Sequence, residues 1–183
     1  MIMSTQALFI VSNLVGGGEV LESYYWGLAS FPEYREALSG GVHGSLRTIL
    51  TISMIFAALG YLLFCYVTLF GDGLVHFNNA NRLGIHTVEI MAVIFLASAA
   101  LWMPSAIYYL KTQDSIWWIV SITVLSITPL ALLTLIYIVV STGSDSIGPG
   151  TKYLAVAGLT SILVFVTSTS HIYIQRNDQM HRI

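Results

Sequence analysis

Charged residues are scarce in this sequence. Only 9% of its 183 residues are charged, seven Lys and Arg against nine Asp and Glu, whereas 56% are hydrophobic. A soluble domain carries about 25% charged residues, so these few cannot cover a soluble globule of this size. High hydrophobicity with little charge also excludes a disordered chain. The net charge of −2 excludes a nucleic-acid binder with a basic surface. The composition therefore indicates an integral membrane protein.

Cysteine is nearly absent as well. Cys65 is the single cysteine, which excludes a disulfide framework, a Cys-ligated cluster and a CxxC redox motif. It lies in an apolar run and is expected to be a small buried side chain. The sequence also has no GxSxG, HExxH or Walker motif, so no catalytic family is indicated. Whether the chain is an enzyme stays open.

Four long runs contain almost no charge. Each is long enough to cross a hydrocarbon core of about 30 Å, which takes roughly 20 helical residues. The runs end near charged residues because a charge at the bilayer centre costs several kcal/mol. We therefore expect an all-α integral membrane protein with a four-transmembrane-helix bundle in residues 47–183. Its spans are predicted at approximately 48–71, 86–110, 115–141 and 153–175.

Residues 1–46 form a separate N-terminal segment. Their beginning is uncharged but lacks the basic region and cleavage site of a signal peptide. The glycine triplet at 16–18 is expected to end a short, possible membrane-inserted helix over residues 2–15, which is too short to span. Residues 19–38 mix acidic and aromatic side chains, as is typical of the headgroup boundary. We predict an interfacial or half-inserted helical segment.

The basic residues predict the orientation. Short cytoplasmic loops carry an excess of Lys and Arg. Five of the seven fall on one side of the predicted bundle, so the region before the first span and the C-terminus are expected to be cytoplasmic. The expected partners are the lipid bilayer and other membrane subunits or further copies of the chain, with no nucleic acid. The five are Arg35, Arg47, Lys111, Arg176 and Arg182, and the other two are Arg82 and Lys152.

The loop between the first two spans concentrates groups that bind metals. It contains Asp72 and His76, four residues apart, and then His86 and Glu89, three residues apart. On helices, each spacing places both side chains on one face. Two facing helix ends would then direct four ligands at one point, which is how helical bundles build metal sites. The sequence predicts a metal site at the extracytoplasmic end of spans one and two.

Each residue of this set has an expected role. His76 and His86 would be the nitrogen ligands and Asp72 the first oxygen ligand, while Glu89 would be a fourth ligand or would orient His86. Imidazole with carboxylate suits Cu(II), iron or zinc rather than Cu(I), and we expect copper first. The leading hypothesis for the function is a subunit of a membrane oxidoreductase complex.

The order D-x3-H followed by a second His resembles the metal site in the C subunit of the copper membrane monooxygenases. In that family, which oxidises methane or ammonia, an Asp and two His on membrane helices bind copper. The resemblance implies the same role for Asp72, His76 and His86. It covers fewer than twenty of the 183 residues, and the two histidines are closer together than in the family pattern.

Three other interpretations stay open. Arg82 could pair with Asp72 or Glu89, and the Asn-rich stretch 78–81 could cap helices, which gives a polar loop without a ligand. The chain could be a non-catalytic accessory subunit whose apolar faces pack against other chains. It could also be a small channel or transporter that uses Glu89 and the hydroxyl groups of the last span.

Haem is disfavoured as a cofactor. His86 and His171 are expected at opposite ends of the bundle, about 30 Å apart, which is too far for one haem. His43 with His171 is the remaining pair at one end. The hydroxyl-rich stripe around His171 is expected to bond to neighbouring carbonyls. It consists of Thr160, Ser161, Thr167, Ser168 and Ser170.

Overall fold

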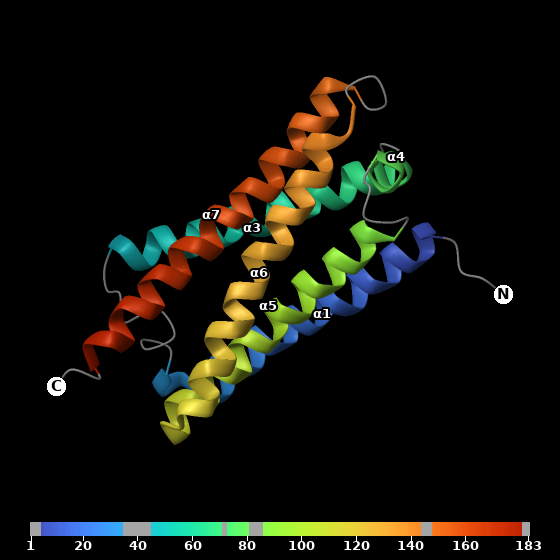
Figure 1. The fold of residues 1–183 in the computed structure, drawn as a ribbon. Coiled ribbons are helices and arrows are strands. Elements are labelled where there is room, and N and C mark those ends of the chain that lie inside the picture. The colour runs from blue at the N-terminus through green and yellow to red at the C-terminus, as the bar shows by residue number, and fades with distance from the viewer. Residues whose placement is uncertain (1–4, 35–44, 71–72, 81–85, 144–147, 181–183) are drawn as a thin grey trace.

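The computed structural model describes residues 5–34, 45–70, 73–80, 86–143 and 148–180. All regular elements in these ranges are helical (Figure 1). In chain order they are α1 (Thr5–Ser30), the 3-10 turn η1 (Pro32–Tyr34), α3 (Ser45–Phe70), α4 (Gly73–Ala80), α5 (Thr87–Thr112), α6 (Ser115–Ser141) and α7 (Pro149–Met180).

Four of these helices are long and apolar enough to cross a membrane. The membrane-crossing parts are Ile52–Phe70 in α3, Thr87–Thr112 in α5, Ser115–Ser141 in α6 and Pro149–Ser168 in α7. The all-α membrane bundle with four transmembrane helices is therefore confirmed. The last span begins at Pro149 rather than at residue 153, because α7 already begins there, and proline is favoured at the first position of a helix.

The helices pack in pairs. α5 and α6 form an antiparallel hairpin with a two-residue turn, in which Gln113 takes the left-handed conformation (φ 55°) and donates its N–H to the Tyr109 carbonyl. The Asp114 side chain then caps α6 by accepting from the Ile116 N–H at 3.0 Å. α7 packs against both α6 and α3, and α1 packs along α5 (Figure 1). The turns fix the order of helices across the bundle.

α3 and α7 approach each other at two glycines. A methyl group added to Gly60 would lie 2.5 Å from the Gly158 carbonyl oxygen, and one added to Gly158 would collide with the Gly60 carbonyl oxygen. Ser161, one turn after Gly158, donates to the Gly158 carbonyl at 2.7 Å. Backbones in such close contact are typical of membrane helices, which associate through small residues.

α1 corrects one prediction from the sequence. The glycine triplet does not end the helix, which continues from Thr5 to Ser30. The reason is packing, because a methyl group on Gly16 would lie 2.9 Å from the Leu96 side chain of α5. Gly17 and Gly18 have nothing within 4 Å of an added methyl group. Contact with α5 therefore outweighs the low helix propensity of glycine, about 1 kcal/mol per residue.

The main core joins residues from all these helices. Phe9 of α1, Phe64 of α3, Phe77 of α4 and Leu132 of α6 are fully buried in it. Phe77 lies next to Asn78 in the short helix α4. Its burial therefore anchors α4 against the bundle and brings Asn78 to the start of α5. The end of the bundle where α3 ends, α4 lies and α5 begins is called the α4 end below.

Candidate functional site

The candidate site is built around a buried carboxylate. Glu89 lies in the first turn of α5 and is only 2% exposed, although it belongs to a membrane-spanning helix. A carboxylate in such a segment is rare and is usually paired or functional. The N-terminus of a helix carries a partial positive charge, which favours a negative side chain there. The first turn of a helix is therefore a favourable position for an acidic side chain.

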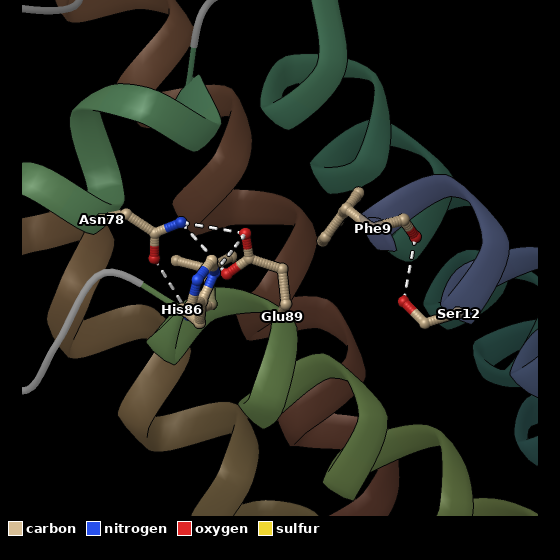
Figure 2. Close-up of polar contacts among 6 residues, drawn as sticks. Phe9, Ser12, Asn78, His86 and Glu89 are labelled. Carbon is tan, nitrogen blue, oxygen red and sulfur yellow. Dashed lines mark hydrogen bonds and ion pairs between the residues drawn. The ribbon is translucent and has the colours of Figure 1, made fainter. Parts of the chain in front are cut away.

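Asn78 of α4 holds this carboxylate in place (Figure 2). Its side-chain N–H groups donate to both oxygens of Glu89, at 3.1 Å to Oε1 and 3.0 Å to Oε2. Its Oδ1 accepts from the backbone N–H of Val88 at 3.2 Å. One buried amide therefore orients the Glu89 carboxylate and also satisfies a free N–H group of the first turn of α5.

His86 stands beside the carboxylate at the N-cap position of α5. Its carbonyl accepts the backbone N–H of Ile90, whereas its side chain makes no capping hydrogen bond. Its Nδ1 lies 3.9 Å from Glu89 Oε1, and the side chain is 48% exposed. This separation exceeds the 2.7–3.2 Å of an N–H···O hydrogen bond. The two groups face each other with no direct hydrogen bond between them.

The other two predicted ligands, His76 and Asp72, are not seen to join the His86–Glu89 pair. His76 lies in α4 and is partly exposed, while Asp72 falls outside the described residues. Within the part of the chain that the structure describes, no three His, Cys, Asp or Glu side chains converge as metal ligands. His76 therefore does not complete a three-ligand set with His86 and Glu89. The four-ligand set that includes Asp72 stays a prediction.

The alternative of a capped polar loop is confirmed in part. Asn78, one of the asparagines in the stretch 78–81, caps α5 as proposed for that stretch. His86 Nδ1 and Glu89 Oε1 lie 3.9 Å apart, so no direct hydrogen bond joins them. The proposed role of Arg82 falls on a residue outside the described ranges.

A second group of polar side chains lies partly buried between α1 and α3. The Tyr61 hydroxyl and, at 3.5 Å, the Cys65 thiol both donate to Asn13 Oδ1, while Asn13 Nδ2 donates to the Phe9 carbonyl at 2.7 Å. The sequence did not indicate this cluster. Its only signal was that Tyr61 and Cys65 stand four residues apart on one helix face. The contact places a polar connection between α1 and the bundle interior.

Three hydroxyl groups of α7 form hydrogen bonds within their own helix. Thr160, Thr167 and Ser168 donate to carbonyls one turn earlier in the same helix, at 2.7, 2.8 and 2.7 Å. This confirms for these three residues the expectation that the stripe bonds to neighbouring carbonyls, while the side chain of Ser170 lies outside the described part. The side chain of His171 and the whole of His43 lie outside the described part, so the haem pair stays untested.

The separation of the His86 and Glu89 side chains can be compared with the spacing of metal ligands. Metal ions such as zinc bind His nitrogen and carboxylate oxygen at about 2.0–2.2 Å, so two donors of one ion stand about 3.4 Å apart in a tetrahedral site and up to about 4.2 Å apart when they lie on opposite sides of the ion. The distance of 3.9 Å between His86 Nδ1 and Glu89 Oε1 lies within this limit. The half-exposed His86 also gives the pair a route to solvent.

Comparisons of the chain with protein-family models, curated proteins and solved structures found no match. The resemblance to the copper membrane monooxygenases therefore rests on Asp72, His76 and His86 alone. Any function must be argued from the geometry of the chain itself.

Proposed function

We propose that this protein binds a divalent transition metal ion at the α4 end, with His86 Nδ1 and Glu89 Oε1 as two of the ligands. The observation that carries the proposal is their separation of 3.9 Å, too long for a hydrogen bond and short enough for one ion to contact both. A buried carboxylate and an exposed imidazole thus form an open pair of donors.

Asn78 supports this role by orienting the carboxylate. Groups that hydrogen-bond a metal ligand fix its direction and commonly change metal affinity by 10- to 100-fold when they are removed. Asn78 donates to both oxygens of Glu89, so it limits the carboxylate to one orientation before an ion arrives. Each carboxylate oxygen has two lone pairs, so Oε1 retains one for the metal.

Copper is the first candidate for the ion, followed by iron and zinc. Imidazole and carboxylate suit these divalent ions, and divalent copper has the highest affinity in the first-row series. Two protein ligands leave coordination positions for water, for a substrate or for Asp72. Metal sites that oxidise a substrate commonly keep open positions for the substrate or for oxygen, so the wider proposal is an extracytoplasmic metal site in a subunit of a membrane oxidoreductase.

Equilibrium dialysis of the purified full-length protein in detergent against Cu(II) or Zn(II) tests the proposal. We expect one ion per chain. His86→Ala and Glu89→Gln should each weaken binding at least tenfold, and Asn78→Ala should weaken it by about 10- to 100-fold. Asn79→Ala is the matched control, because this neighbouring asparagine is exposed and should leave binding unchanged.

Two results would change the proposal. If the double variant His86→Ala/Glu89→Gln keeps wild-type affinity while its helical circular dichroism is unchanged, the pair is not a metal site. If His76→Ala weakens binding as much as His86→Ala does, the larger ligand set predicted from the sequence is supported instead.

A further inference from the structure

The outer face of α1 has the spacing of a helix-pairing seam. Six of its exposed residues follow one another at intervals of three and four, the pattern by which two helices interlock. Leu14, Leu21 and Tyr25 are more than 70% exposed, although they are large and apolar. The seam is formed by Val11, Leu14, Gly18, Leu21, Tyr25 and Leu28.

α1 lies beside the central part of a membrane span. Gly16 contacts Leu96, and Gly27 contacts Met103 and Ile107. Residue numbers increase in the same direction along both helices, so α1 and α5 are parallel, as Figure 1 shows. The stretch between Gly16 and Gly27 therefore lies at the level of residues 96–107, around the middle of the Thr87–Thr112 span.

Two carboxylates occur in this same stretch. Glu19 and Glu22 are exposed on α1, at the level where α5 crosses the centre of its span. A charged side chain facing lipid at the bilayer centre costs at least about 2.5 kcal/mol, so such groups pair or face a polar environment. Gly17 and Gly18 beside them leave open space, which allows a second helix to approach closely.

Among the residues that the structure describes, no Lys or Arg lies at this depth. All seven Lys and Arg lie outside the membrane-crossing segments or at their ends, and Lys111, near Phe31, marks the end of α5. A second copy would therefore bring only the same two carboxylates to the seam. The charges point to a different partner.

We propose that the outer face of α1 is a docking surface for a transmembrane helix of another protein, one with a Lys or Arg near its middle. The apolar seam supplies the packing, and Glu19 with Glu22 supplies the counter-charge. This proposal concerns a different face from the His86–Glu89 pair and does not depend on metal binding.

A designed partner tests the surface directly. The probe is a 23-residue polyleucine peptide with one central Lys, compared with the same peptide carrying Gln. Association with the full-length protein is measured by energy transfer in phosphatidylcholine vesicles. We expect the Lys peptide to bind at least ten times more tightly than the Gln peptide. Glu19→Gln/Glu22→Gln should remove that preference.

Two variants distinguish binding at the seam from nonspecific apolar contact between the peptide and the protein. Leu21→Ala should weaken binding of the Lys peptide, whereas Leu130→Ala, at an equally exposed apolar position on α6, should not. Equal binding of the Lys and Gln peptides would overturn the proposal, as would binding of labelled copies of the chain to one another in place of the peptide.

The depth of α1 is checked separately. Gly18→Cys in a Cys65→Ala background introduces a single thiol where there is open space. Slow reaction with a membrane-impermeant maleimide in vesicles is expected. Reaction as fast as that of a water-exposed thiol would place α1 outside the bilayer and contradict the proposal.

Discussion

Asn78 and Glu89 join α4 to α5 through a single side chain. The Asn78 amide donates to both carboxylate oxygens of Glu89, while its carbonyl oxygen accepts from the Val88 N–H in the same turn. Both side chains are buried, at 6% and 2% exposed. The contact between α4 and α5 therefore depends on Asn78, which the sequence alone suggests is part of a polar loop.

Asn78→Ala should destabilise the protein by about 2 to 3 kcal/mol, because it leaves a buried carboxylate and a buried N–H group without partners. Reversible unfolding in mixed detergent micelles measures the loss. Asn79→Ala, at an exposed position, is the control and should stay within about 0.5 kcal/mol. Equal stability of the two variants would show that Asn78 does not hold Glu89.

Gly60→Ala should loosen the contact between α3 and α7. The added methyl group meets the backbone of Gly158, which cannot move as a side chain can, so we expect a cost of about 1 to 3 kcal/mol. Thermal unfolding in detergent is the measurement. Gly150→Ala, which has nothing within 4 Å, should cost nothing. A fully stable Gly60→Ala protein would mean that the helices are farther apart.

The glycine triplet offers an internal comparison. Gly17→Ala should stabilise α1 by up to about 1 kcal/mol, since alanine favours helix and no neighbour opposes the methyl group. Gly16→Ala should destabilise the protein, because its methyl group overlaps Leu96. Unfolding of the two variants under the same conditions compares them. The same effect at both positions would argue against packing of α1 on α5.

The Asn13–Tyr61 hydrogen bond should have a measurable coupling energy. A double-mutant cycle with Asn13→Ala and Tyr61→Phe is expected to give about 0.6 kcal/mol and no more than about 1.7 kcal/mol, the range for hydrogen bonds between membrane helices. Asn13→Ala with Thr160→Ala is the control pair, since Thr160 bonds only within α7 in this structure. A coupling of zero for Asn13 and Tyr61 would contradict the contact.

The sequence predicted the spans well because charge marks their ends, and it failed where packing decides. The low helix propensity of the glycine triplet at 16–18 suggested a helix end there. In the structure α1 continues past the triplet, because Gly16 packs against Leu96. The proximity of His86 and Glu89 was predicted correctly, because the two residues are three positions apart at the start of one helix. The polar bond between Asn13 and Tyr61 joins residues 48 positions apart, and no local pattern could indicate it.

The central claim is that His86 and Glu89 bind one metal ion, and electron paramagnetic resonance of the Cu(II)-loaded protein tests it most directly. We predict a single bound Cu(II) with hyperfine coupling to one imidazole nitrogen, lost in His86→Ala and retained in His76→Ala. A Cu(II) spectrum that is identical in wild type and His86→Ala, or the absence of any tightly bound copper, would contradict it.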